Sequence, residues 1–172
     1  MVEQSDKTFR IVKRKDGKFG LFNEPVPTPG EGEVLIQVEY SSVNPVDAIF
    51  YQIQKDEGFT LGSEGTGIVV EVGNGVSDDL KGRKVSFLNG GWSEYKVDKV
   101  HNLLLLDDSQ DLTKSANAFI NPLTSAGMVD YAKSVGAKVV IVTAAGAQLG
   151  QQFIKLAKSQ GIDTIGIVRR DE

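Results

Sequence analysis

The stretch VVIVTAAGAQLGQQFIKLAKSQGIDTIGIVRR, residues 139–170, decides the fold of the second half of the chain. Val139–Val142 is a continuous apolar run, which is typical of a strand buried on both faces. A helix with one mostly apolar face follows, and Gly161 is well placed to end it. Ile165–Val168 has the pattern of a second strand. A strand, a helix and a strand of this length predict a right-handed crossover between two parallel strands.

The turn between the first strand and the helix, TAAGAQLG, has the spacing of a dinucleotide-binding turn. Such a turn needs small residues for its tight bend, for close approach of the backbone to a pyrophosphate, and for helix–strand packing. Ala145, Ala147 and Gly150 occupy these three places. Because a helix N-terminus offers free N–H groups and a partial positive charge to a phosphate, we expect cofactor contacts along the whole turn, from Ala145, Gly146, Ala147, Gln148, Leu149 and Gly150. Alternatively, the small residues serve only the packing of an ordinary strand–helix turn.

The end of the second strand indicates which dinucleotide is bound. Sites specific for NAD place an acidic side chain there to hold the ribose 2′-hydroxyl. This chain has Arg169 followed by Arg170, and an arginine can pair with a 2′-phosphate through two hydrogen bonds. The sequence therefore predicts NADPH as the cofactor, with two solvated arginines as the alternative interpretation.

The first hundred residues have the pattern of a β domain with glycine-rich turns. Pro25, Pro27 and Pro29 indicate an extended connector, because proline cannot donate to a strand ladder. Asn89-Gly90 is a hairpin signal, so we expect the last two strands to pair with each other. The expected strands are Thr8–Lys13, Val34–Tyr40, one within 62–75, Lys84–Leu88 and Ser93–Val97.

From Asp111 the pattern changes to that of helices. Ser115–Ile120 and Thr124–Ser134 favour helix, with Pro122 as a break between them and Gly136 as the end of the second. The sequence thus predicts an α/β chain with a large β part. We expect a β domain over residues 1–114 and a partial dinucleotide-binding domain over 115–172.

Composition excludes several classes of function. The chain has 172 residues, a net charge of -4, one histidine and no cysteines. Disulfides and thiolate metal sites are therefore excluded, and the negative charge argues against a nucleic-acid partner. No apolar run approaches membrane-spanning length, and the N-terminus has no apolar signal core. We expect no membrane insertion and a cytoplasmic location, with mitochondria as the alternative.

Five segments, taken in order, carry a resemblance to a known family. They are PGEGEVLIQVEYSSVNPVD (29–47), LGSEGTGIVVEVG (61–73), GRKVSF with GGWSEYKV (82–97), NPLTSAGM (121–128) and the turn described above. They resemble the medium-chain dehydrogenase/reductase superfamily, on its zinc-independent side: quinone oxidoreductases and mitochondrial-type 2-enoyl thioester reductases. The resemblance implies an N-terminal GroES-like β-barrel domain followed by the first β-α-β portion of a Rossmann fold.

The resemblance also implies an activity, which is hydride transfer from NADPH to an activated C=C bond or a quinone. Asn44, in NPVD, would lie near the nicotinamide, although a turn residue before proline is an alternative. Thr124 resembles a threonine that packs against the nicotinamide ring, with a helix N-cap as its alternative. Enoyl reductases carry a presumed proton-donating tyrosine where this chain has Lys55. Tyr51, four residues earlier, would replace that tyrosine only if the loop rearranged, so the general acid is unassigned.

The zinc-binding pattern of other family members is absent. Asp47 and Ser63 stand where those members have cysteine and histidine, and Glu64 resembles an acid that lies near their metal. We therefore expect no metal.

Family members of this kind continue for roughly as long again. A Rossmann sheet has six strands in the order 3-2-1-4-5-6, and only strands 1 and 2 are expected here. The resemblance thus implies either that the 172 residues are part of a longer chain or that a partner covers the open edge, as in a homodimer or a larger assembly. A small-molecule substrate is expected in the first case. In the second, a non-catalytic structural subunit that retains the reductase fold is the competing hypothesis.

Overall fold

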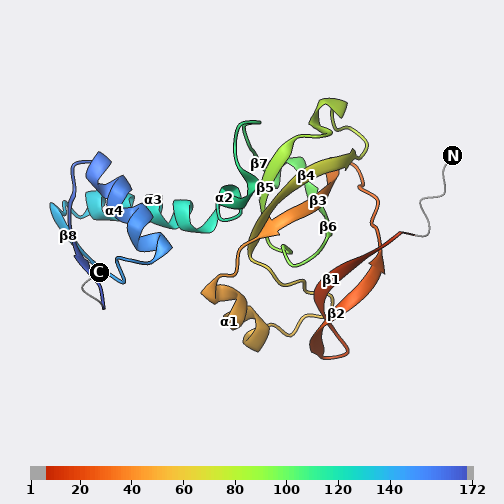
Figure 1. Ribbon diagram of the computed structural model, residues 1–172, viewed down its shortest axis with the longest axis horizontal. Coiled ribbons are helices and arrows are strands. Elements are labelled where there is room, and N and C mark those ends of the chain that lie inside the picture. The colour runs from red at the N-terminus through yellow and green to blue at the C-terminus, as the bar shows by residue number, and fades with distance from the viewer. Residues whose placement is uncertain (1–6, 170–172) are drawn as a thin grey trace. The chain divides into compact units, whose positions relative to one another are not determined.

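The computed structural model describes residues 7–169 and divides them into two compact units (Figure 1). The N-terminal unit ends at Asn117 and the C-terminal unit begins at Ala118. No helix in the described range is long and apolar enough to cross a membrane.

A five-stranded antiparallel sheet forms the body of the N-terminal unit, with the strand order β6-β3-β4-β5-β7 (Figure 1). The core of this sheet consists of fully buried apolar side chains, contributed by Val34, Ile36, Val69, Val85 and Phe87. Two irregularities in the register between β3 and β4 accompany the glycine-rich sequence of β4, as expected for bulges. The strands are β3 (Glu33–Ser41), β4 (Glu64–Val72), β5 (Lys84–Leu88), β6 (Tyr95–Lys99) and β7 (Leu104–Leu105).

The predicted hairpin through Asn89-Gly90 is wrong. The two residues do form a turn with positive φ angles of 60° and 70°, but β5 pairs with β4 and β7, while β6 pairs with β3. The segment after the turn pairs instead with the residues before β4: Gly91 N donates to Gly62 O at 3.0 Å, and Trp92 N donates to Leu61 O at 3.0 Å. A Cβ at Gly62 would lie 2.4 Å from Trp92 N, so glycine is needed for this backbone approach.

A separate hairpin precedes the sheet, and the sequence predicted only the first of its two strands. β1 (Thr8–Lys15) pairs antiparallel with β2 (Lys18–Pro25). Asp16 and Gly17 join them with φ angles of 53° and 77°, the conformation that Asp-Gly favours in a two-residue hairpin turn. The Asp-Gly pair was the sequence signal that could have revealed β2.

Short helical elements complete the N-terminal unit. The exposed His101 lies in one of them. They are α1 (Pro45–Ile53), η1 (Asp78–Leu80), η2 (Val100–Asn102) and α2 (Leu112–Ser115).

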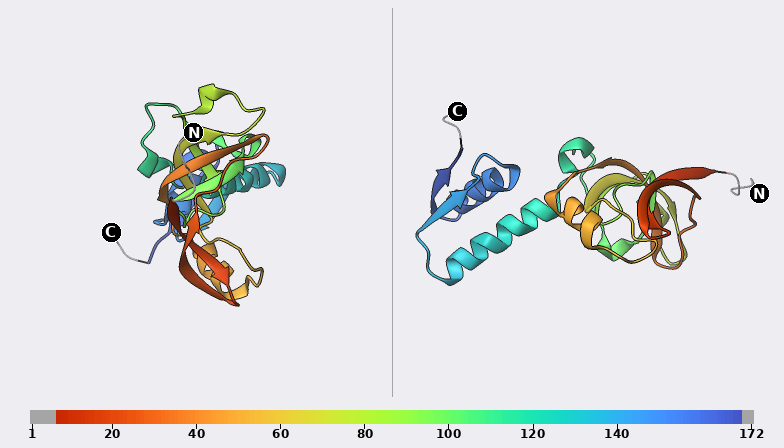
Figure 2. Two further views of the ribbon diagram at one scale, coloured as in Figure 1. Left: turned by 90° about the vertical axis from the view of Figure 1, so that its right-hand side faces the viewer. Right: turned by 90° about the horizontal axis from the view of Figure 1, so that it is seen from below.

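The C-terminal unit contains two helices and a two-stranded parallel sheet (Figure 2). β8 pairs with β9 so that Val139 faces Asp163 and Thr143 faces Ile167. The predicted parallel β-α-β unit is thereby confirmed. Gly161, with a φ of 74°, follows the end of the connecting helix as predicted. The elements are α3 (Ile120–Ser134), β8 (Val139–Thr143), α4 (Gln148–Ser159) and β9 (Asp163–Ile167).

The predicted helix break at Pro122 is wrong. α2 ends at Ser115, and α3 begins at Ile120 with Pro122 in its first turn. The first N–H groups of a helix have no intrahelical acceptor, so a proline costs little there. Thr124 therefore lies inside α3, and its interpretation as the helix N-cap is also wrong.

One face of the parallel sheet is covered and the other is exposed among the described residues. Val142 is buried in a core with Phe153 and Ala157 of α4 and with Val129 of α3. On the opposite face Ile141 is 63% exposed. The prediction that β8 is buried on both faces is therefore wrong for the described part of the chain.

Candidate functional site

A buried carboxylate organises the start of α1. Asn44 is the residue before the helix and Pro45 opens it, a position where proline is preorganised for the helical backbone. Asp47 is 1% exposed. Its Oδ2 accepts the backbone N–H of Asn44 at 2.7 Å, and its Oδ1 accepts that of Ser63 at 2.8 Å. Asp47 thus ties the start of α1 to the residue that precedes β4.

The Asn44 side chain lies in a polar cluster that this arrangement creates. Its Nδ2 is 2.8 Å from Ser42 Oγ, 3.0 Å from Ser63 Oγ and 3.0 Å from Glu64 Oε1. Ser42 Oγ also donates to Glu64 Oε1 at 3.2 Å, and Glu64 is fully buried. Because the two amide N–H groups are shared among three acceptors, the Asn44 carboxamide has a defined orientation.

The other two predicted catalytic residues have simpler surroundings. Tyr51, on α1, is 58% exposed and stacks on Phe19 with ring centroids 5.3 Å apart. Thr124, on the exposed surface of α3, donates from Oγ1 to Ile120 O at 2.6 Å.

Potential metal ligands do not gather within residues 7–169, where no group of three or more His, Cys, Asp or Glu side chains could hold a metal ion. Asp47 and Glu64 are engaged in the hydrogen bonds described above.

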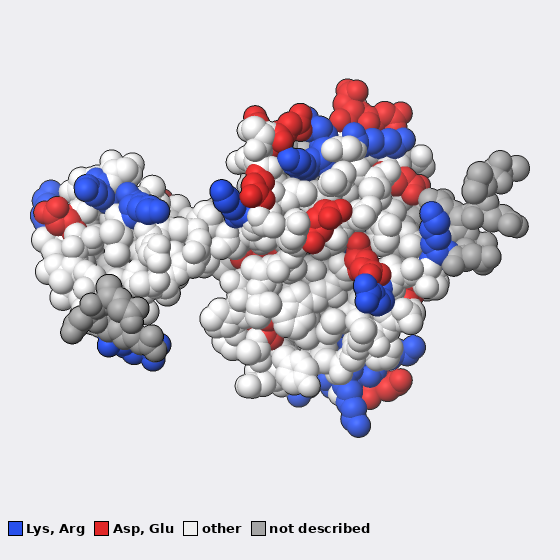
Figure 3. Space-filling model, in the orientation of Figure 1, with Lys and Arg blue, Asp and Glu red and all other residues white. Residues whose placement is uncertain are grey.

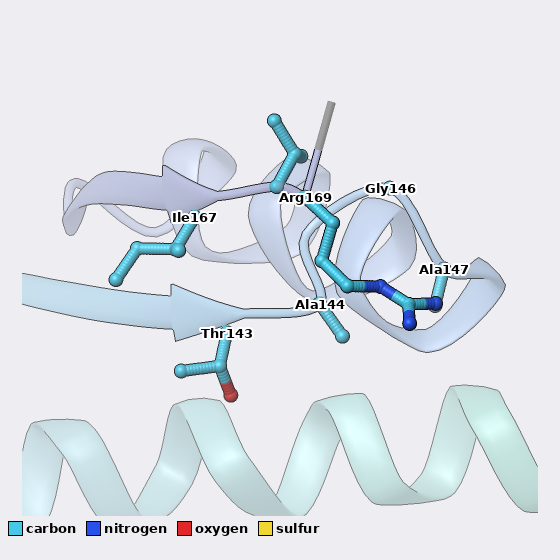
Figure 4. A pocket seen from close by; sticks show the side chains of 7 residues that line it. Thr143, Ala144, Gly146, Ala147, Ile167 and Arg169 are labelled. Atoms are coloured by element: carbon cyan, nitrogen blue, oxygen red, sulfur yellow. The ribbon is translucent and has the colours of Figure 1, made fainter. Parts of the chain in front are cut away.

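A hollow of about 850 Å³ opens where β8 and β9 end in the C-terminal unit (Figure 4). It brings together three of the predicted cofactor residues, Gly146, Ala147 and Arg169. Residues that sequence reasoning missed complete its lining: Thr143, Ala144, Ile167 and Val168. Their position directly at the carboxyl ends of two parallel strands was the signal that could have found them.

The residues of the turn divide into two roles. A Cβ at Gly150 would lie 2.8 Å from Ala144 O and 2.9 Å from Ala145 Cα, so Gly150 permits α4 to pack closely on the turn. Ala145 is buried, and its N–H donates to Ile167 O at 3.1 Å. At Gly146 an added Cβ would meet only Val168 Cγ1 at 3.8 Å. The backbone at Gly146 therefore faces open space, where another molecule can approach it.

The start of α4 has free hydrogen-bond donors. Ala147 is its N-cap and has no side-chain acceptor. The first intrahelical bond runs from Gln151 N to Ala147 O at 2.9 Å, so the N–H groups of the exposed Gln148, the half-buried Leu149 and the buried Gly150 have no acceptor within the helix. Such a helix start fits a phosphate group.

The charge around the hollow is also suited to an anion. The Arg169 side chain extends toward the turn beside Ala147 (Figure 4). The described residues of the C-terminal unit include five Lys and Arg against two Asp, and blue groups predominate on this unit in the view of Figure 3. Arg170, predicted to assist Arg169, lies outside the described residues. The hollow thus combines a cation with free N–H groups, as a dinucleotide site requires.

Comparison with known proteins shows what the chain is similar to. Residues 30–108 match the family model of the alcohol dehydrogenase GroES-like domain. The chain is 28% identical over 155 residues to a quinone oxidoreductase of Rattus norvegicus, covering 86% of this chain and 47% of that protein. It is 31% identical over 149 residues to a mitochondrial enoyl-[acyl-carrier-protein] reductase of Caenorhabditis elegans, covering 82% and 43%.

A solved structure extends the similarity to the fold. A proposed NADPH:quinone reductase of Mesorhizobium loti superimposes with a TM-score of 0.81 and 30% identity, over 99% of this chain and 56% of that one. The chain spans about half the length of the relatives it matches. The predicted fold class, α/β with an N-terminal GroES-like part, is confirmed. Residues 30–108 carry the alcohol dehydrogenase GroES-like domain, and the chain resembles the quinone oxidoreductases and mitochondrial enoyl reductases of the medium-chain dehydrogenase/reductase superfamily.

Proposed function

We propose that this protein is an NADPH-dependent oxidoreductase that reduces an activated C=C bond or a quinone. The observation that carries the proposal is the hollow at the ends of β8 and β9, which combines the open backbone of Gly146, the uncapped start of α4 and the Arg169 guanidinium. Relatives that are quinone oxidoreductases and enoyl reductases support it, as does a structural neighbour described as an NADPH:quinone reductase.

The residues of the C-terminal unit would bind the cofactor. The N–H groups of Gln148, Leu149 and Gly150 would hold the pyrophosphate, because they lack intrahelical acceptors. Arg169 would pair with the 2′-phosphate. When bound, NADPH supplies the hydride for the reduction.

The residues of the catalytic step are proposed from the resemblance to the family. Asn44, whose side chain is held by Ser42, Ser63 and Glu64, would lie near the nicotinamide. Thr124 would pack against the nicotinamide ring. Tyr51 remains a candidate general acid only if its stacking on Phe19 is broken.

A non-catalytic structural subunit is the second candidate. The observation that favours it is that Lys55 stands where enoyl reductases carry the presumed proton-donating tyrosine. We propose a homodimer or a further subunit on the open edge of the β8–β9 sheet in either case. The compartment is proposed as cytoplasmic, with mitochondria as the alternative, and the domain boundary as residues 114–115.

NADPH oxidation tests the proposal. We expect oxidation of NADPH in the presence of crotonyl thioesters or simple quinones, and much slower oxidation of NADH. An intact mass of the natural protein should accompany the assay, so that the whole molecule is tested. NADPH binding without turnover of either substrate class would contradict the reductase assignment. Loss of both binding and turnover would support the structural subunit.

A further inference from the structure

A second pocket lies between the two helices of the C-terminal unit. It has a volume of about 410 Å³ and is lined by Pro122 and Ser125 of α3 and by Gln152, Lys155, Leu156 and Ser159 of α4. None of these residues lines the hollow at the strand ends. The volume lies within the range of about 300–1,000 Å³ that is typical of small-molecule sites.

Two buried polar atoms in the wall of this pocket have no hydrogen-bond partner. Within residues 7–169 only three buried side-chain polar atoms lack one, and two of them, Ser125 Oγ and Gln152 Oε1, belong to residues that line this pocket. Ser125 is 2% exposed. A serine inside a helix can donate to the carbonyl four residues earlier, as Thr124 does to Ile120, yet Ser125 does not. Buried polar groups are rarely left unpaired, because the loss of their hydration is unfavourable.

The two atoms and their neighbours define what could pair with them. Gln152 Oε1 needs an N–H or O–H donor, and the Ser125 hydroxyl can donate to an oxygen. Lys155 adds an exposed ammonium at the rim, which favours a carboxylate. Pro122 and Leu156 present apolar surface that suits a short carbon chain. We propose that the α3–α4 pocket binds a small carboxylate that carries a neighbouring hydroxyl or ammonium donor.

This site is independent of the proposed reductase function, because it shares no residue with the proposed NADPH site. Its carboxylate would accept from Ser125 and lie near Lys155, and its hydroxyl or ammonium group would donate to Gln152. A hydrogen bond between neutral groups, such as that from the ligand hydroxyl to Gln152, changes affinity about two- to tenfold. A carboxylate without the donor should therefore bind measurably more weakly.

The test is a titration of the full 172-residue chain with lactate, in which the amide chemical shifts of α3 and α4 report binding. The titration is then repeated with propionate, which lacks the hydroxyl. We expect lactate to bind at least threefold more tightly than propionate. Ser125→Ala and Gln152→Met should each weaken lactate binding at least threefold. Ser134→Ala, an exposed serine in the same helix, should leave it unchanged. Equal affinities for the two acids, or no saturable shift with either, would overturn the proposal.

Thermal unfolding without any added acid provides a second, independent readout. If Ser125 Oγ is unpaired in the free protein, Ser125→Ala removes an unsatisfied group, and the melting temperature should stay the same or rise. A clear fall in melting temperature would show that Ser125 is already paired, either within the protein or with a trapped water, and would overturn the proposal.

Discussion

At the residue scale, the Asp47 carboxylate accepts two backbone N–H groups, those of Asn44 and Ser63, whose side chains meet in the polar cluster. The two residues are far apart in sequence, so neither local helix capping nor strand pairing alone would hold them together. The orientation of the Asn44 carboxamide therefore depends on a residue that touches no proposed ligand.

Asp47→Ala should destabilise the protein by about 2–6 kcal/mol, because it leaves two N–H groups without an acceptor at about 1–3 kcal/mol each. Unfolding in urea measures the difference. Asp47→Asn should give an intermediate loss, since its amide oxygen replaces only one of the two acceptors. Glu39→Ala, at an exposed position of β3, is the matched control and should change stability by less than about 0.5 kcal/mol. Equal stability of Asp47→Ala and Glu39→Ala would contradict the role assigned to Asp47.

Arg169 tests the choice of cofactor. A charge-assisted bidentate contact with a 2′-phosphate contributes about 1.5–3 kcal/mol, which is roughly 10- to 150-fold in affinity. Arg169→Ala should therefore weaken NADPH binding at least tenfold and leave NADH binding nearly unchanged. It should also reduce the salt dependence of NADPH affinity. Fluorescence titrations measure both cofactors, with Lys158→Ala, an exposed position on α4, as the control. An equal loss for NADPH and NADH would mean that Arg169 only supports the fold.

At the element scale, the contact between the start of α4 and the turn after β8 depends on a missing side chain. Ala144 has a positive φ of 51°, and its carbonyl oxygen would lie 2.8 Å from a Cβ at Gly150. The backbone of the turn therefore packs directly against the backbone at the start of the helix. A larger residue at position 150 would move the helix start away from the hollow.

Gly150→Ala should destabilise the C-terminal unit by about 1–3 kcal/mol, the usual cost of overpacking, and should weaken NADPH binding as well. Gly127→Ala is the matched control in α3, where an added Cβ meets nothing within 4 Å. That substitution should stabilise its helix by about 0.5–1 kcal/mol, because alanine loses less backbone entropy than glycine. Urea unfolding compares the two. The idea of a backbone contact fails if both substitutions shift stability in the same direction.

At the scale of the whole N-terminal unit, an ion pair joins the β1–β2 hairpin to the main sheet. Glu94 accepts from Arg10 Nε at 2.8 Å and from Arg10 N at 2.7 Å. The hydrogen bonds and charge of Arg10 lower the pKa of Glu94 below its ordinary value. A carboxyl with a lowered pKa stabilises the fold above its unfolded pKa, and this contribution disappears as the pH falls through the folded pKa.

The stability difference between the natural protein and Glu94→Gln should therefore be largest above about pH 5, should decline below the ordinary glutamate pKa of about 4.3, and should vanish only below the lowered folded pKa. Both side chains are partly exposed, so the effect should be small and should decrease with added salt. Denaturant unfolding across this pH range measures it. Arg10→Gln should give the same loss, and the double variant should lose little more. A difference between natural protein and Glu94→Gln that does not change with pH would contradict the pairing.

Local signals in the sequence were sufficient for several parts of the fold. The change of period, the glycines after the helices and the small-residue turn predicted the parallel β-α-β unit, and Arg169 was predicted from its place at a strand end. The break at Pro122 was predicted wrongly because a proline pattern does not show whether the residue lies within a helix or in its first turn. The residue-level roles of Asn44, Thr124 and Tyr51 came from resemblance and stay predictions.

The sequence by itself determined the parallel β-α-β unit, several strands of the β domain and the family resemblance, because periodicity, turn residues and ordered motifs depend on neighbours in the chain. Only the tertiary structure decided that β5 pairs with β4 and β7 while β6 pairs with β3. It also decided that Asp47 joins Asn44 to Ser63, and that Ser125 and Gln152 line one pocket. Those arrangements depend on which distant backbone or side-chain groups become partners. A local turn signal such as Asn89-Gly90 cannot specify that choice, because the competing pairing with residues 61–63 is made across the fold.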